Sequence, residues 1–70
     1  MKSYQILVVW SPVDRAFVAQ VPDLPGCMAH GATKEKALEN IRQAVDLYTD
    51  DLLRTGQGIP APREYQLVSA

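Results

Sequence analysis

Cys27 and His30 are the only cysteine and histidine of the chain, and they lie three positions apart. An imidazole that takes the proton of a neighbouring thiol makes a nucleophile for covalent catalysis. Side chains alternate between the two faces of a β-strand, so residues 27 and 30 of a regular strand point to opposite faces. Cys27 is therefore better interpreted as a buried structural residue. One cysteine also excludes an internal disulfide, and one cysteine with one histidine is too few for a four-ligand zinc site.

Four carboxylates suggest a second kind of chemistry, the metal-dependent cleavage of nucleic acid. Convergent carboxylate oxygens hold Mg²⁺ in such enzymes, and the candidates here are Asp14, Asp23, Glu35 and Glu39. Asp14 also suits a hairpin turn, Asp23 suits a capping position in a proline-containing loop, and Glu35 suits the start of a helix. These simpler roles are preferred, so we expect no catalytic residue, no metal site and no cofactor.

Charge and hydropathy restrict the classes of partner. The 7 Lys and Arg residues and the 8 Asp and Glu residues give a net charge of -1. The basic residues are scattered from Lys2 to Arg63, whereas duplex binding by counterion release needs a clustered basic face. We therefore expect no direct binding to nucleic acid. No apolar run approaches the roughly 18 to 20 residues of a membrane span, and the N-terminus lacks the apolar region of a secretion signal, so a cytoplasmic location is expected.

The elements that must position these residues begin with a β-hairpin. Apolar residues alternate over residues 3–10 and again over 15–21, and Pro12 favours a turn between the two segments. We assign one face of the first strand to the core; it carries Tyr4, Ile6, Val8 and Trp10. A short third strand is expected over residues 27–30.

The opposite face of the hairpin is also apolar. A face of this kind is covered either by another layer of the same chain or by a second molecule. The residues expected to form an oligomer interface are Leu7, Val9, Ala16 and Val18. We expect one domain over 1–70. A chain of 70 residues buries only about 60% of its unfolded surface, so association into a homodimer or homotetramer is the favoured source of extra stability.

Residues 22–26 read Pro-Asp-Leu-Pro-Gly and predict a rigid loop, because two prolines and a glycine exclude regular structure. The loop is explained equally well as a simple chain reversal or as a surface that presents Leu24 to a partner, since a stiff loop loses little entropy on binding.

One amphipathic helix of about five to six turns follows the third strand. Thr33 is its expected N-cap, and Gly56 is expected in the left-handed conformation after its last turn. Residues 57–62 form a connector, and weak alternation over Glu64 to Val68 predicts a fourth strand. The expected fold is α+β, with a three-stranded antiparallel sheet, one helix packed on one of its faces, and then a fourth strand.

Two segments carry a resemblance to a known family. VPDLPGC at 21–27, followed by HGATKEKALENIRQAVDLY at 30–48, resembles the HicB antitoxins and the small HicB-like domains, although Lys36 replaces the usual Glu. The resemblance covers about residues 4–68. It implies a partial ribonuclease-H-like fold with a lost active site, homo-oligomers, and direct neutralisation of a HicA toxin that cleaves mRNA. The chain stops at Ala70, so only the toxin-binding or oligomerising half of the larger HicB proteins is implied, without their DNA-binding segment.

Two modes of toxin binding are open. The loop residues Asp23, Leu24, Pro25 and Gly26 would cover the toxin's active site, or acidic helix residues would meet its basic RNA-binding surface, namely Asp46, Asp50 and Asp51. The alternatives are an orphan homo-oligomeric domain with no toxin partner and, less favoured, a metal-dependent nuclease.

Overall fold

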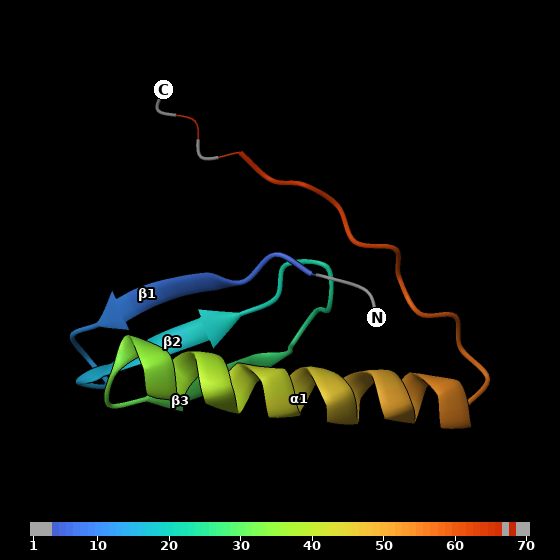
Figure 1. Ribbon diagram of the computed structural model, residues 1–70, viewed down its shortest axis with the longest axis horizontal. Helices are drawn as coiled ribbons and strands as arrows, with labels where there is room; N and C mark the ends of the chain where they lie inside the picture. The colour runs from blue at the N-terminus through green and yellow to red at the C-terminus, as the bar shows by residue number, and fades with distance from the viewer. Residues whose placement is uncertain (1–3, 67, 69–70) are drawn as a thin grey trace.

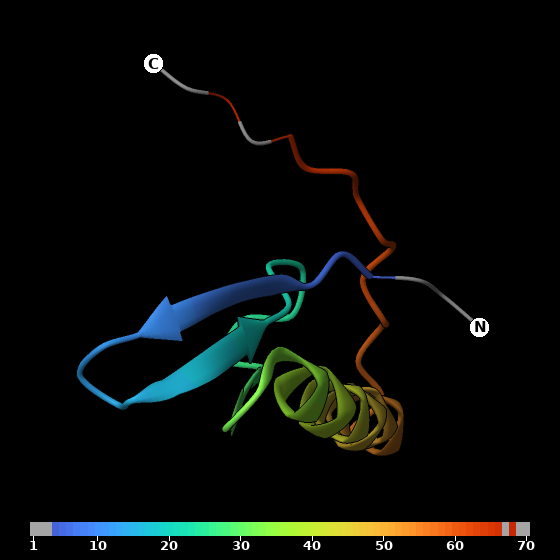
Figure 2. The ribbon, with the colours of Figure 1, turned by 60° about the vertical axis from the view of Figure 1, so that its left-hand side comes forward.

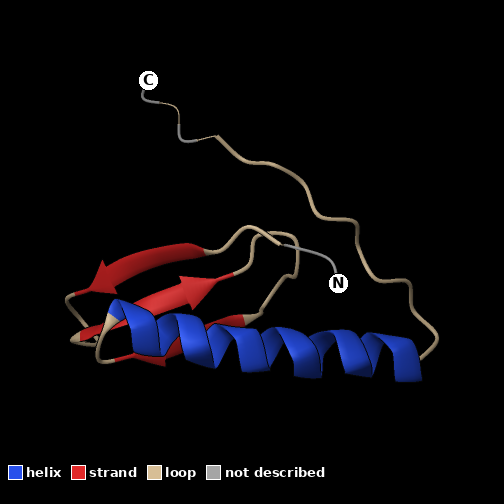
Figure 3. Cartoon of the chain, viewed as in Figure 1, coloured by secondary structure: helices blue, strands red, loops and turns tan. Residues whose placement is uncertain are grey.

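The computed structural model describes residues 4–66 and 68. Strands β1 (Leu7–Ser11), β2 (Ala16–Gln20) and β3 (Met28–Gly31) precede one helix, α1 (Lys34–Arg54). The strands form an antiparallel sheet in the order β1-β2-β3, and α1 lies across one face of it (Figures 1 and 3). This confirms the α+β fold with three strands and one covering helix.

The β1-β2 hairpin confirms the two strands and the turn that the sequence predicts. Val9 lies opposite Val18, and Trp10 lies opposite Phe17. In the connecting turn, the Ser11 hydroxyl donates to the Asp14 carboxylate at 2.9 Å, and the Asp14 N–H donates back to the Ser11 oxygen at 3.3 Å. Asp14 therefore serves the turn, as expected.

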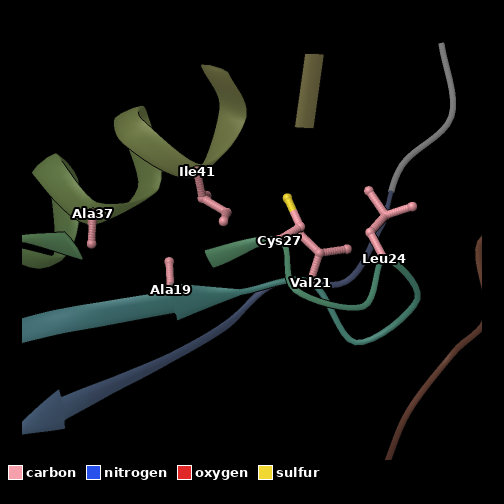
Figure 4. Packing of buried hydrophobic residues seen from close by; sticks show 6 residues of the cluster. All are labelled: Ala19, Val21, Leu24, Cys27, Ala37 and Ile41. Carbon is pink, nitrogen blue, oxygen red and sulfur yellow. The ribbon is translucent and has the colours of Figure 1, made fainter. Parts of the chain in front are cut away.

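The core lies between the helix and the helix-facing side of the sheet. Figure 4 shows the side chains of Ala37 and Ile41 directed from α1 toward Ala19 on β2. The buried cluster consists of Ala19, Val21, Leu24, Cys27, Ala37 and Ile41. Tyr4, Ile6 and Val8 pack against this cluster, which confirms the core face of the first strand. Trp10, on the same face, stays 51% exposed and contacts the Phe17 ring edge to face.

Both ends of α1 are capped as expected. The Thr33 hydroxyl accepts from the Lys36 N–H at 3.0 Å, which is an N-cap. At the other end Gly56 has a φ of 77°, and the N–H of Gln57 donates to the Leu52 carbonyl at 2.8 Å. This is a Schellman motif, in which a left-handed glycine satisfies the last carbonyls and turns the chain back. In the described part of the chain no helix is long and apolar enough to cross a membrane.

The helix and β3 approach each other most closely at Gly31. A Cβ atom on Gly31 would lie 2.3 Å from the backbone nitrogen of Ala37. Beside it, the Asn40 amide donates to the His30 carbonyl at 2.7 Å. The absence of a side chain at residue 31 therefore sets how closely α1 packs on the sheet.

The fourth strand expected over Glu64–Val68 is not shown, because residues 64–66 and 68, the ones that the structure describes there, form no strand. Residues 57–66, named the C-terminal segment below, follow an irregular path instead (Figure 1). Pro60 and Pro62 lack a backbone N–H, so neither can donate to a ladder. Side chains rather than a ladder hold this segment: the Tyr4 hydroxyl donates to the Pro60 carbonyl, and Gln5 accepts from the Tyr65 N–H at 3.3 Å.

We predict that Gly31→Ala lowers the free energy of unfolding by about 1–3 kcal/mol, because the new methyl group meets helix backbone that cannot move aside. Urea unfolding followed by circular dichroism measures this difference. Gly58→Ala is the matched control, since no atom lies within 4 Å of its added Cβ. Equal stability of the two variants would contradict the role given to Gly31.

Candidate functional site

The loop over residues 22–26 is a rigid structure. The Leu24 N–H donates to the Val21 carbonyl at 3.0 Å, and the Cys27 N–H donates to the Leu24 carbonyl at 2.9 Å. The Tyr48 hydroxyl on α1 donates to the Pro25 carbonyl at 2.9 Å. Hydrogen bonds thus hold the loop in one shape and join it to the second half of the helix.

Leu24 does not lie on the surface of this loop. Its side chain is 0% exposed and belongs to the core. The side chain of Leu24 turns inward because removing its apolar area from water is favourable. The exposed part of the loop consists of Pro22, Pro25 and Gly26. A partner that binds the folded loop would therefore contact these residues and not the side chain of Leu24.

Asp23 is buried as well, with 6% of its surface exposed. Its carboxylate accepts hydrogen bonds from the Arg63 N–H at 2.8 Å, from the Arg63 Nε at 2.7 Å and from the Tyr65 hydroxyl. The hydrogen bond from Tyr65 does most to hold the pKa of Asp23 below its usual value; burial opposes this, and Arg63 lowers the pKa further. Asp23 therefore anchors the C-terminal segment to the loop.

A shallow apolar groove lies between α1 and the end of the loop with the start of β3. This loop–helix groove is widely open to solvent, has a volume of about 350 Å³, and is lined by Gly26, Cys27, Met28, Ala44, Leu47 and Tyr48. Leu47 is 71% exposed on the helix, and Met28 is exposed on the strand. Two large apolar side chains thus line a surface that the folded chain leaves uncovered.

The three acidic helix residues singled out from the sequence are exposed on the second half of α1, at positions 46, 50 and 51. Asp51 follows Leu47 by four residues and so lies on the same helix face, beside the groove. The carboxylate of Asp50 pairs with the Arg54 guanidinium at 3.3 Å, an exposed pair of the kind that adds little stability. On the helix side, the groove therefore has Asp51 beside it, and the charge of Asp50 is balanced by Arg54.

Among the described residues, the groups considered for catalysis form no common site. Burial raises the pKa of the Cys27 thiol, and Cys27 is a core residue as expected. The partner of the exposed His30 is not Cys27: its Nε2 atom lies 3.6 Å from the carboxylate of Asp14. Glu35 occupies the first turn of α1, and Glu39 pairs with Lys36. Among residues 4–66 and 68, no three His, Cys, Asp or Glu side chains gather in a way that would hold a metal ion.

The sheet face turned away from α1, named the open sheet face, carries the residues expected at an oligomer interface. Leu7 and Val9 are exposed, Ala16 is half-buried, and Val18 is buried even though no helix or strand among the described residues covers this face. Val18 lies in the central strand between Val9 and His30, and these neighbours shield it. The exposed apolar area of this face is therefore concentrated at β1 and at Met28 of β3.

Comparisons with known proteins find similarity over most of the chain. A family model described as the HicB-like antitoxin of bacterial toxin–antitoxin systems matches residues 4–70. A UPF0150 protein of Thermoplasma acidophilum is 37% identical over 77% of this chain and 78% of its own length. A UPF0150 protein of Synechocystis is 38% identical over 80% of this chain and 68% of its own length. A third, from Helicobacter pylori, is 44% identical over 56% of this chain and 54% of its own.

We predict that the pKa of Asp23, measured by NMR titration, lies below 3.8 and rises in Tyr65→Phe, which removes the hydrogen bond that lowers it most. A carboxyl whose pKa is lower in the folded state stabilises the fold above its unfolded pKa, and this stability is lost as the pH falls through the folded value. Thermal unfolding below about pH 4 should therefore depend less on pH in Asp23→Asn than in the unmodified chain. Asp46→Asn, an exposed control, should keep the original acid dependence; a change as large as that in Asp23→Asn would contradict the assignment.

Proposed function

Because the chain belongs to the family of HicB-like antitoxins of bacterial toxin–antitoxin systems, we propose that it neutralises a HicA-like, mRNA-cleaving toxin by binding it directly. The observation that carries this proposal is the loop–helix groove, in which an uncovered Leu47 lies beside a rigid loop. The protein acts in this proposal as a protein-binding module and not as an enzyme. It works in the cytoplasm, where mRNA is cleaved and where the thiol of Cys27 stays reduced.

The shape and chemistry of the groove suit an apolar side chain of the toxin. Interfaces draw most of their affinity from a few large side chains that enter pockets and lose contact with water. The loop adds Pro25 and Gly26 to one wall, and it is already ordered by its hydrogen bond to Tyr48, so binding costs little further ordering. Asp23 contributes indirectly, by keeping the loop and the C-terminal segment in place.

Electrostatic attraction between α1 and the toxin is a further part of the proposal. A ribonuclease needs a positively charged surface to bind RNA, and the exposed Asp46, Asp50 and Asp51 give the second half of α1 complementary charges. Their attraction would speed association and would be screened at high salt. The antitoxin would thus compete with RNA for the same toxin surface.

Self-association is the second part of the proposal. We propose that the open sheet face, through Leu7, Val9, Ala16 and Val18, contributes to a homodimer or homotetramer. The exposed Leu7 and Val9 support this, because burying apolar area of this kind is favourable. An orphan oligomer without a toxin partner is the alternative function, and it would use this face and not the groove.

The test uses a purified HicA-like toxin, taken from the neighbouring gene where that gene encodes a small basic protein. We predict that the unmodified chain forms a stoichiometric complex with it and stops its cleavage of RNA. Leu47→Lys should weaken binding by about tenfold or more, since it places a charge in the groove. Isothermal titration calorimetry measures the affinity, and a cleavage assay measures the inhibition.

Leu53→Lys is the matched control, because it makes the same change on the same helix at another exposed leucine. Six residues further along, at about 100° per residue, it lies on a different helix face and should bind normally. Failure of the unmodified chain to bind or inhibit this protein would favour the orphan alternative. Equal effects of Leu47→Lys and Leu53→Lys would remove the groove from the binding site.

A further inference from the structure

The strand β3 has one edge that faces away from the rest of the sheet, and two hydrogen bonds identify the backbone groups that lie there. The Val21 N–H donates to the Cys27 carbonyl at 3.2 Å, so the backbone of Cys27 faces β2. The His30 carbonyl accepts from the Asn40 amide on α1 and so faces the other way. Backbone groups alternate between the two edges of an antiparallel strand, so those of Met28 face outward together with those of His30.

This outward edge is closed at one residue and open at another. Asn40 takes up the carbonyl of His30. Among the described residues β2 is the one strand paired with β3, so no strand pairs with the outward groups of Met28. The C-terminal segment lies near the start of β1, where the Tyr65 N–H donates to Gln5, and both views show it leading away from β3 (Figures 1 and 2). Within the described chain, the N–H and carbonyl of Met28 are therefore open to a partner.

The open backbone groups of β3 belong to the loop–helix groove. Met28 lines this groove together with Gly26 and Cys27, and Ala44 and Leu47 line it from α1. The groove thus combines an apolar wall on the helix with a backbone donor and acceptor on the strand edge. A partner that fills the groove has to satisfy both, because a polar group that loses water without gaining a hydrogen bond opposes binding.

A helix and an extended segment differ in how they meet this requirement. The backbone groups of a helix bond within the helix, so a helix in the groove would cover Leu47 but would leave the backbone of Met28 without partners. An extended segment donates to the Met28 carbonyl and accepts from the Met28 N–H, as a strand added to a sheet edge does. Its side chains alternate, so every second one points to the helix side, where Ala44 and Leu47 lie. The groove therefore suits an extended segment better than a helix.

We propose that the groove binds an extended segment of the toxin, which pairs with β3 at Met28 and places a large apolar side chain against Leu47. This inference rests on the proposed function, since the partner is the toxin. β3 is only 4 residues long and Asn40 closes it at His30, so the segment gains few backbone hydrogen bonds. The apolar side chain in the groove therefore supplies most of the affinity. Asp51 beside the groove favours a basic residue next to that side chain.

Amide hydrogen exchange followed by NMR tests the backbone contact. In the free chain, the Met28 amide should exchange far faster than the amide of Ala29, the control on the same strand, which faces β2. In the complex with the purified toxin, exchange at Met28 should slow by about tenfold or more, because its N–H then donates to the bound segment. Slow exchange at Met28 in the free chain would overturn the open edge. A complex that forms without slowing this exchange would overturn the extended segment in favour of a helix and would leave the proposed function intact.

Met28→Pro tests the same contact through the affinity for the toxin, measured by isothermal titration calorimetry. Proline removes the N–H and is tolerated at the first residue of an edge strand, which is where Met28 lies. Met28→Ala is the matched control, because it also removes the methionine side chain but keeps the N–H. We predict that Met28→Pro binds the toxin about fivefold more weakly than Met28→Ala.

Circular dichroism checks that both variants are folded, and the exchange measurement decides if Met28→Pro is not. Equal affinities of the two folded variants would overturn the pairing at Met28. Absence of binding by the unmodified chain would overturn the proposed function, and this inference with it.

Discussion

A single helix has to cover a three-stranded sheet in this protein, and it is too narrow to do so completely. A helix with its side chains is about 10–12 Å wide, and three strands spaced by about 4.8 Å present a surface at least as broad. The position of the helix is fixed by Gly31, where β3 meets the backbone of α1 with no side chain between them. The helix therefore covers β3 and β2 well and leaves β1 half-covered, with Trp10 at its margin. The groove proposed for binding follows from this placement, because it lies on the β3 side of the helix. On the far side lies β1, which among the described residues is paired with β2 alone.

The Asp23 carboxylate compensates for what so small a chain lacks. Disulfides and metal ions are the usual means of joining distant parts of a small domain, and here a buried carboxylate joins the loop to Arg63 and Tyr65. Burying a charge is costly unless hydrogen bonds satisfy it, and three donors satisfy this one. The same residue that makes the loop recognisable in the sequence thus has a structural role in the fold, and the surface left for a partner is formed by its neighbours.

The features that were predictable from the sequence are local ones. The hairpin, the N-cap Thr33, the left-handed Gly56 and the apolar stripe of α1 each depend on residues within a few positions of one another. The inward direction of Leu24 was not predictable, because the two prolines beside it suit a surface loop equally well. The ties from Asp23 to Arg63 and Tyr65 join residues at least 40 positions apart, and no periodicity signals them. The expected strand near Tyr65 relied on a short alternation, and that alternation contains no information about where a partner strand lies.

The sequence separation between contacting residues also predicts the order in which the contacts form during folding. The hairpin and the helix form from neighbouring residues and therefore need little loop closure. The cluster of Asp23, Arg63 and Tyr65 closes a loop of 40 residues or more, and it can do so only after β3 and α1 have brought the chain back past the loop. We therefore expect this cluster to assemble last and to be among the first parts to open in native-state fluctuations. The local contacts of the hairpin and the helix would then form a framework first, and the contacts of the buried charge would close it.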